Sequence, residues 1–85
     1  MAKTVLITGS TSGIGLGIAK AFAAQGCNII FNGLETDGAT IAQQVADEFK
    51  IKHIFSPANM LDVEAINNMV ADGATAVGQI DILVN

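Results

Sequence analysis

The chain has 85 residues, which fit one small domain at most, and 51% of them are apolar while few are aromatic. This balance favours a buried α/β sheet over a disordered segment. The net charge of -4, with four lysines and no arginine, disfavours a nucleic-acid-binding surface.

Four further absences narrow the class of protein. No apolar run approaches the roughly 20 residues that span a bilayer, and the chain starts without the pattern of a signal peptide. The single cysteine, Cys27, excludes an internal disulfide, and the spacing of ligand-type residues matches no metal site. We therefore expect a cytoplasmic protein without a membrane, nucleic-acid or metal partner.

Short apolar runs alternate with helical patterns along the chain, and this alternation predicts βαβ units around a parallel sheet. Strands are expected over four apolar runs, at 4–8, 29–31, 53–55 and 81–84. Helices are expected over three stretches: one at 13–25, ended by a left-handed cap at Gly26, one that follows a cap at Thr36 or Asp37, and one between Asp62 and Gly78.

Each predicted helix carries apolar residues at helical spacing, which indicates the face that packs on the sheet. These residues are Ile14, Ile18 and Phe22 in the first helix, Ile41, Val45 and Phe49 in the second, and Ile66, Met69, Val70, Ala74 and Val77 in the third. Right-handed crossovers then wind the strands in the order 3-2-1-4, with the third helix on the opposite face. The prediction is a Rossmann-type parallel sheet, part of a doubly wound α/β fold, whose ligand site lies beside the first and fourth strands.

Segment 8–15, TGSTSGIG, follows the first apolar run and opens the first predicted helix. Such a turn forms a cradle for an anion, because backbone N–H groups and the helix dipole point there. The first glycine permits positive φ, the second permits close approach of a pyrophosphate, and the third permits close packing of the helix. The predicted site comprises Gly9, Ser10, Thr11, Ser12, Gly13, Ile14 and Gly15, with the hydroxyls as extra donors. The alternative is a turn that only joins a strand to a helix.

The spacing G-x-x-x-G-x-G differs from the common G-x-G-x-x-G fingerprint and from triphosphate-binding loops. It resembles the cofactor motif of the short-chain dehydrogenase/reductase family. The longer string TGSTSGIGLGIA at 8–19, with AAQG at 23–26 and Asn32-Gly33, resembles the D-3-hydroxybutyrate dehydrogenases within that family. The likeness extends from Thr4 to Asn85, and it implies that residues 1–85 form the N-terminal, cofactor-binding part of one short-chain dehydrogenase domain.

The choice of cofactor rests on three positions. The end of the second strand, which often carries an acid that binds the ribose of NAD, has Asn32 here, and no lysine or arginine lies between Asn28 and Phe49 to attract a 2′-phosphate. At the position where NADP-dependent members of the family usually carry a basic residue, this chain has Ser12. Leu34 matches a bulky apolar residue of the resembled subfamily and would fill the space of a 2′-phosphate. The resemblance therefore implies NAD, although Asn32-Gly33 is also a common strand-ending turn.

After the third strand the family has an aspartate and an apolar residue against the adenine, and chain order aligns this pair with Asn59 and Met60. An asparagine carbonyl can accept a hydrogen bond from the adenine amino group. Asp62 is the rival, although its place before a helix favours an N-cap. Glu35 is interpreted as a solvated loop charge, with a ribose contact as the alternative, and His53 as a packed or edge residue.

The resemblance places catalysis outside this sequence. The family uses a Ser, a Tyr and a Lys further along the chain, where the lysine lowers the pKa of the tyrosine so that it exchanges a proton with the substrate. This chain has no tyrosine and reaches only the first residue, Asn85, of the family's Asn-Asn-Ala-Gly motif. No catalytic residue is therefore assigned.

The function implied for the whole protein is NAD-dependent oxidation of D-3-hydroxybutyrate to acetoacetate by hydride transfer. Its partners would be a small hydroxy-acid or keto-acid substrate and further copies of the same chain. Two alternatives remain open, an NADP-dependent 3-oxoacyl carrier-protein reductase and a non-catalytic dinucleotide-binding module. The fourth strand would leave an apolar edge, so we also expect the 85-residue chain by itself to be poorly soluble or loosely folded.

Overall fold

A computed structural model describes residues 2–85. Four strands alternate with three helices in the order β1 (Thr4–Ile7), α1 (Gly13–Ala24), β2 (Asn28–Asn32), α2 (Gly38–Phe49), β3 (His53–Ser56), α3 (Val63–Val77) and β4 (Ile82–Val84). Every predicted strand and helix is present, with ends that differ from the prediction by one residue.

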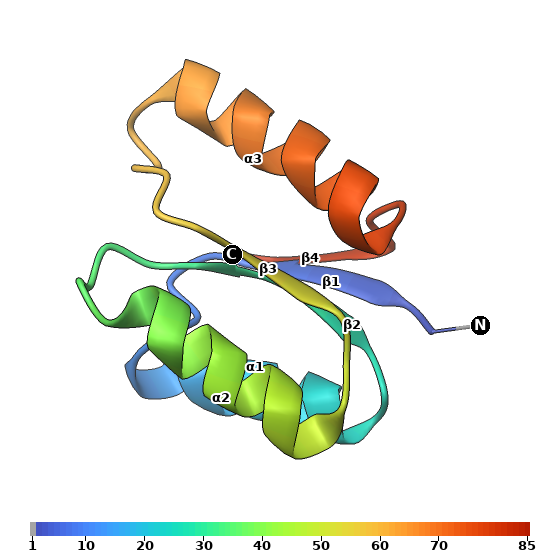
Figure 1. The fold of residues 1–85 in the computed structure, drawn as a ribbon. Helices are drawn as coiled ribbons and strands as arrows, with labels where there is room; N and C mark the ends of the chain where they lie inside the picture. The colour runs from blue at the N-terminus through green and yellow to red at the C-terminus, as the bar shows by residue number, and fades with distance from the viewer. Residues whose placement is uncertain (1) are drawn as a thin grey trace.

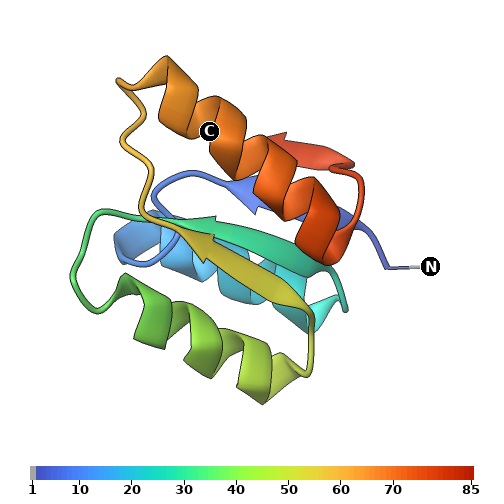
Figure 2. The same cartoon turned by 45° about the horizontal axis from the view of Figure 1, so that its top comes forward.

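The four strands form one parallel sheet in the order β3-β2-β1-β4, which confirms the predicted topology. Central β1 pairs on both sides, so that Leu6 lies between Ile30 of β2 and Leu83 of β4. Helices α1 and α2 cover one face of this sheet and α3 covers the other (Figures 1 and 2). Strands β1 to β3 are added to the sheet in one direction and β4 is added on the other side of β1. The carboxyl ends of β1 and β4 therefore lie side by side at this switch point.

The core has two parts because successive strand residues point to opposite faces. The part under α1 and α2 contains Val5 and Ile7 of β1 with Ile29 and Phe31 of β2. The part under α3 is built on the alternate residues of these strands, together with side chains of the helix: Leu6, Ile30, Met69 and Val77. The strands of β1 and β2 are buried on both faces, which explains why they are nearly continuous apolar runs.

The predicted faces of α1 and α3 need correction. Ile14 is 85% exposed, whereas α1 buries Ala19 and Ala23. A helix turns by about 100° per residue, so the stripe through Gly15 and these two alanines faces the sheet. The predicted stripe, one position earlier, flanks it and is covered only at its later residues, Ile18 and Phe22.

In α3 the predicted face is confirmed at Met69 and Val77, which are buried, and at Ile66, which packs partly buried beside them. The predicted Val70 and Ala74 are exposed, and Gly73, which was not predicted, is buried. Gly73 allows the helix to approach the sheet closely, because a Cβ there would lie 2.9 Å from Cγ1 of Ile30. The sequence pattern did not predict Ala19, Ala23 and Gly73 as core positions, because small residues contribute little to a periodic apolar pattern.

The helix caps also differ from one another. Asp62 precedes α3, and its Oδ1 accepts a hydrogen bond from the N–H of Ala65 at 3.1 Å, as predicted. Asp37 is the residue before α2, but its side chain makes no cap bond. The predicted left-handed Gly26 follows α1 with φ of 83°, and Lys50 adopts the same left-handed region after α2.

Candidate functional site at the carboxyl edge of the sheet

The glycine-rich loop joins β1 to α1 at the carboxyl edge of the sheet, beside β4. Gly9 and Gly13 both have positive φ, 58° and 53°, which side chains rarely allow. The first of these values confirms the prediction for Gly9. The hydroxyl of Thr8 donates to Oδ1 of Asn85, and its N–H donates to the carbonyl of Val84, so the loop begins attached to the end of β4.

Gly15 fixes how closely α1 approaches this loop. A Cβ at Gly15 would collide with the carbonyl oxygen of Gly9 and lie 2.8 Å from its carbonyl carbon. The close packing predicted for Gly15 is therefore present, and it is directed at the backbone of the loop. The first turn of α1 is held against the segment that would surround an anion.

Asn32 ties the loop to the sheet. Its side chain is almost completely buried, with Oδ1 accepting from the N–H of Gly9 at 3.1 Å. Its Nδ2 donates to the carbonyls of Ser56 and Ala58 at 3.2 and 2.9 Å. Since two carbonyl oxygens require donors and the N–H of Gly9 requires an acceptor, an uncharged amide is the side chain that satisfies all three. Sequence reasoning assigned Asn32 to the cofactor, whereas the structure shows its side chain bonded to three backbone groups, one in the glycine loop and two at and just after the end of β3.

Two of the three hydroxyls of the loop, those of Ser10 and Thr11, are committed to the protein, which corrects their expected role as free donors. Ser10 is fully buried, and its Oγ accepts from the N–H of Asn32 at 2.9 Å and donates to the carbonyl of the same residue at 3.3 Å. Thr11 is buried and donates to Glu35. Ser12, the N-cap residue of α1, is exposed and makes no side-chain cap bond. Of the three hydroxyls, the one on Ser12 is therefore exposed at the helix N-terminus.

Glu35 lies closer to the glycine loop than its place in the sequence indicates. Its Oε2 accepts a hydrogen bond of 2.5 Å from Oγ1 of Thr11. The hydrogen bond from Thr11 and, to a smaller extent, the nearby hydroxyl of Ser12 lower the pKa of the carboxyl group below its ordinary value. Glu35 is therefore a carboxylate at neutral pH, placed beside the loop.

A cleft of about 320 Å³ opens between the loop and the ends of β2 and β3. It brings together four of the predicted positions, Asn32, Leu34, Asn59 and Met60, with Gly9 of the loop. Leu34 is 69% exposed and available for contact. The lining also contains residues that sequence reasoning did not assign to the site: Thr8, Gly33, Glu35 and Ala58.

The predicted adenine contacts are at the rim of this cleft. Oδ1 of Asn59 accepts from the N–H of Leu61 at 2.9 Å, which leaves its second lone pair for an adenine amino group. Met60 is partly exposed beside it. Asp62 is bonded to its own helix and lines a neighbouring groove, so its N-cap interpretation is the one that the structure supports.

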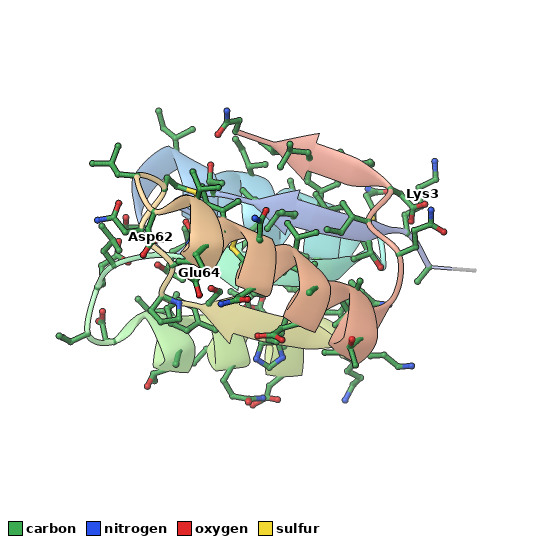
Figure 3. The ribbon with its side chains drawn as sticks, turned by 90° about the horizontal axis from the view of Figure 1, so that it is seen from above. Lys3, Asp62 and Glu64 are labelled. Carbon is green, nitrogen blue, oxygen red and sulfur yellow. The ribbon has the colours of Figure 1, made fainter. Side chains whose placement is uncertain are left out.

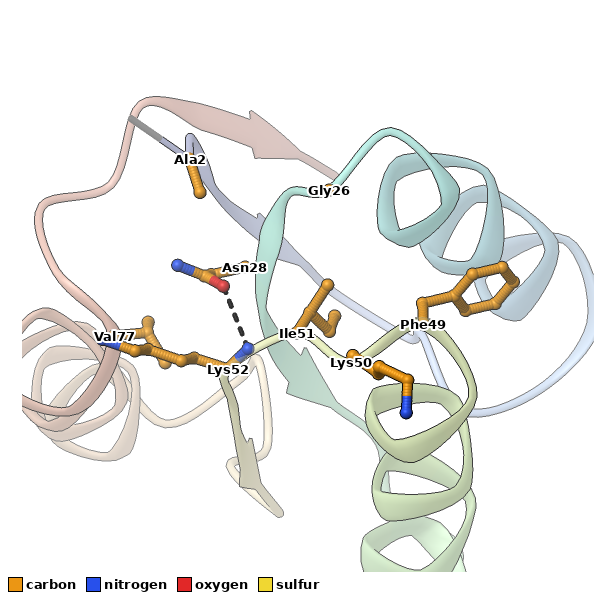
Figure 4. Close-up of a pocket in the computed structure, with 8 residues that line it drawn as sticks. All are labelled: Ala2, Gly26, Asn28, Phe49, Lys50, Ile51, Lys52 and Val77. Atoms are coloured by element: carbon orange, nitrogen blue, oxygen red, sulfur yellow. Dashed lines mark hydrogen bonds between the residues drawn. The ribbon is translucent and has the colours of Figure 1, made fainter.

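The lysines that line a cleft lie at the amino ends of the strands and not beside the glycine loop. Figure 3 labels Asp62 and Glu64 at the start of α3 and Lys3 at the opposite end of the molecule. A larger cleft, of about 580 Å³, lies at the amino ends of the strands and is lined by Lys50 and Lys52 (Figure 4). No lysine lines the cleft beside the glycine loop among the residues described. An anion there would be held by backbone N–H groups and the dipole of α1.

The other two residues considered from the sequence, His53 and Cys27, are packed against the protein core. His53 begins the edge strand β3, with its ring edge-on to Phe31 at 6.0 Å, and partial burial lowers its pKa. Cys27 is free and half-buried just before β2. Across residues 2–85 no group of three or more His, Cys, Asp or Glu side chains forms a metal site. Within the same residues, no helix has the length and apolar character needed to cross a membrane.

The sheet order, the helices on both faces and the glycine loop at the switch point define a Rossmann-type α/β protein. The sequence profile described as short chain dehydrogenase matches residues 3–85. The chain belongs to this short-chain dehydrogenase family.

The individual proteins that resemble this chain include two D-beta-hydroxybutyrate dehydrogenases. The one from Cupriavidus necator is 47% identical over 83 residues, which are 98% of this chain and 32% of the relative. The one from Rhizobium meliloti is 42% identical over 87 residues and covers 100% of this chain and 34% of the relative. A 3-oxoacyl-[acyl-carrier-protein] reductase from Aquifex aeolicus is 37% identical, covering 98% of this chain and 34% of the relative.

Among solved structures, the L-sorbose reductase from Gluconobacter frateurii, complexed with NADPH and L-sorbose, superposes with a TM-score of 0.91 at 32% identity. The match covers 99% of this chain and 32% of that structure. The chain therefore spans about a third of the length of these relatives.

Proposed function

We propose that residues 1–85 are the N-terminal cofactor-binding part of a larger short-chain dehydrogenase domain, which oxidises D-3-hydroxybutyrate to acetoacetate with NAD. The observation that carries this proposal is the glycine loop held at the carboxyl edge by Asn32, with a cleft beside it that contains no cation. The likeness to the two D-beta-hydroxybutyrate dehydrogenases supports the substrate.

In this proposal the diphosphate lies over the loop of Gly9, Ser10, Thr11, Ser12, Gly13, Ile14 and Gly15. Backbone N–H groups and the exposed hydroxyl of Ser12 bind it, while Ser10 and Thr11 shape the loop from within. The adenosine occupies the cleft between Leu34 and the pair Asn59 and Met60. When NAD is bound, its nicotinamide accepts a hydride from the carbon that bears the substrate hydroxyl.

The choice of NAD over NADP rests on charge and space. A 2′-phosphate in this cleft would meet Glu35 and the exposed side chain of Leu34, and no lysine of the lining would compensate its charge. Sites that bind NADP usually place a basic side chain beside the 2′-phosphate. The described cleft offers none.

A second candidate, an NADP-dependent 3-oxoacyl carrier-protein reductase, is favoured by the 37% identity to the Aquifex aeolicus reductase. Binding constants for NAD and NADP on the full-length protein distinguish the two. We expect tighter binding of NAD, and a clear preference for NADP would contradict the proposal. A non-catalytic module is distinguished by a turnover assay with D-3-hydroxybutyrate and NAD, in which it would show no formation of NADH.

The rest of the proposal concerns the full-length protein. Its catalytic Ser, Tyr and Lys would lie beyond Asn85, and it would act in the cytoplasm as a homo-oligomer. The substrate would be a small hydroxy acid or keto acid. Size-exclusion chromatography with light scattering tests the oligomeric state, and a monomer would contradict it.

A further inference from the structure

Asn32 and Gly33 form the only Asn-Gly pair in the sequence. An asparagine before glycine is the most prone to deamidate, because glycine has no Cβ to hinder attack by its own backbone nitrogen on the asparagine side chain. The pair lies at the end of β2, in the wall of the cleft beside the glycine loop. The proposed dehydrogenase activity makes no use of this reactivity.

The fold requires both residues at these places, for different reasons. The side chain of Asn32 supplies one acceptor and two donors to backbone groups of the neighbouring segments. Gly33 leaves room for the glycine loop, because a Cβ there would collide with the hydroxyl of Thr11. A less reactive pair would therefore lose either hydrogen bonds or space in the cleft wall.

Deamidation of this pair needs no reactant other than water. The backbone nitrogen of Gly33 gives its proton to hydroxide and attacks Cγ of Asn32. Nδ2 then takes a proton from water and leaves as ammonia, which regenerates hydroxide and closes a succinimide ring between the two residues. Addition of water to either carbonyl of the ring gives aspartate or isoaspartate.

In the folded protein the atoms of this reaction are held by hydrogen bonds. Gly33 is buried, and its N–H donates to the carbonyl of Ser56 at 3.4 Å. Nδ2 of Asn32, the leaving group, donates to two carbonyls, and Oδ1 accepts from the N–H of Gly9. Oγ of Ser10 accepts from the backbone N–H of Asn32 at 2.9 Å. Because ring closure makes Cγ tetrahedral and releases Nδ2, these bonds must break first, which requires local opening of the cleft wall.

We propose that Asn32 is a latent deamidation site, closed by the hydrogen bonds of the cleft wall and exposed when the end of β2 separates from the glycine loop and β3. The product cannot close in the same way, because a carboxylate lacks both donors of the amide. An isoaspartate also lengthens the backbone at the end of β2. Deamidation therefore converts a transient opening into a permanent loss of stability.

The test incubates the full-length protein at mildly alkaline pH and measures deamidation by trypsin digestion and mass spectrometry, with a sample digested at zero time as the blank. Trypsin releases residues 21–50 as one peptide that carries both Asn32 and Asn28. In urea, Asn32 should react at least about tenfold faster than Asn28, which precedes a β-branched isoleucine. In the folded protein the rate at Asn32 should be at least about tenfold lower than in urea.

Three variants locate the opening that controls the rate. Ser10→Ala removes the hydroxyl bonded to the backbone of Asn32 and should raise the folded-state rate several-fold without changing the rate in urea. Thr75→Ala removes an exposed hydroxyl of α3 and should change neither rate. Gly73→Ala disturbs the core under α3, outside the cleft lining, and should keep the folded-state rate within about twofold of the wild type, since the opening is local.

The product is tested separately. The deamidated fraction carries an extra negative charge, so anion exchange isolates it from the aged folded protein. We expect it to unfold at a lower urea concentration than the unmodified protein, and equal midpoints would contradict the permanent loss of stability.

Equal rates in the folded protein and in urea would overturn the proposal, because the fold would then give no protection. An unreactive Asn32 in urea would overturn it too, as would a rate that rises as much in Gly73→Ala as in Ser10→Ala, since global unfolding would then control the reaction. Circular dichroism checks each variant, and the wild-type comparison decides alone where Ser10→Ala does not fold. None of these readouts needs a dinucleotide, so they are independent of the proposed function.

Discussion

The amide of Asn32 shows how one side chain can hold together the wall of a cleft through hydrogen bonds to the backbone. It joins the glycine loop, the end of β2 and the chain after β3 through three hydrogen bonds. Each partner is a backbone group, and the Asn32 side chain itself is almost completely buried, so a hydrogen bond that it left unmade would cost stability. The chemistry of the amide, with donors at one atom and an acceptor at the other, is therefore what this position requires.

Asn32→Asp is expected to lower the free energy of unfolding by about 3 kcal/mol, because it removes both donors and buries a charge against two carbonyl oxygens. Urea denaturation of the full-length protein measures this change. Asn28→Asp is the matched control, since the side chain of Asn28 uses only Oδ1, which accepts from Lys52, and an aspartate retains that acceptor. Equal losses in the two variants would contradict the role given to Asn32.

Two glycines of α1 provide a second prediction at this scale. Gly15→Ala places a methyl group against the backbone of Gly9 and should destabilise the protein by about 2 kcal/mol. It should also weaken NAD binding at least tenfold, since it displaces the loop. Gly17→Ala meets nothing within 4 Å among the described residues and should be neutral or stabilising by up to about 1 kcal/mol, because alanine favours helix. Denaturation and dinucleotide titration of both variants test the pair, and a harmless Gly15→Ala would refute it.

At the scale of the element, the helices are set on the sheet by small residues and by their ends. Both α1 and α3 approach closely through glycine or alanine, at Ala19 and Ala23 in one and at Gly73 in the other. Their larger apolar side chains flank the contact. The ends differ because α3 has a side-chain cap and α1 and α2 have none.

The cap gives a direct comparison between two aspartates. Asp62→Ala removes the bond to the N–H of Ala65 and should cost about 1 kcal/mol of stability. Asp37→Ala removes no such bond and should change stability by no more than a few tenths of a kcal/mol. Thermal or urea unfolding measures both. NAD affinity should be unaffected by Asp62→Ala, and a large loss of affinity would revive its rival interpretation as an adenine contact.

The contact between Gly73 and Ile30 is testable by a double-mutant cycle. Gly73→Ala should destabilise the protein by about 1–2 kcal/mol, because its methyl group overlaps the side chain of Ile30 in a packed core. Ile30→Val removes the outermost methyl group and should relieve part of that overlap. We therefore expect the double variant to be more stable than the sum of the single changes predicts. Additive changes would show that α3 moves away from the sheet instead.

At the scale of the whole molecule, the two edges of the sheet differ in polarity. β3 carries His53 and Ser56 at its ends, whereas β4 presents only apolar residues, with Leu83 63% exposed. Near β4 lies a hollow lined by Leu6, Met60, Ile66, Val70 and Leu83. Exposed apolar edges of this kind promote strand pairing between molecules.

The 85-residue chain by itself is therefore expected to self-associate, and Leu83→Lys should reduce this association by placing a charge on the exposed edge. Sedimentation or light scattering at increasing concentration measures the effect. Leu34→Lys is the control, because Leu34 is also exposed but lines the cleft beside the glycine loop and not the hollow near β4. A monomeric chain with a sharp cooperative melt would contradict the expectation.

The order of strands and helices, the parallel sheet and the position of the glycine loop were all predictable from the amino-acid sequence. These follow from local signals: apolar runs long enough for buried strands, glycines where φ is positive, and helical spacing between them. Asp62 was identified as a cap for the same reason, since the bond it makes spans only three residues.

The hydrogen-bond partners of the side chains near the cleft could not be predicted without the fold. Asn32, Ser10 and Thr11 were predicted to face a cofactor, yet each is buried and bonded to a residue more than 20 positions away in the sequence. Glu35 was interpreted as a solvated charge, yet it reaches Thr11 across Gly33. Hydrogen bonds between distant segments depend on how β1, β2 and β3 align, and a linear pattern does not contain that alignment.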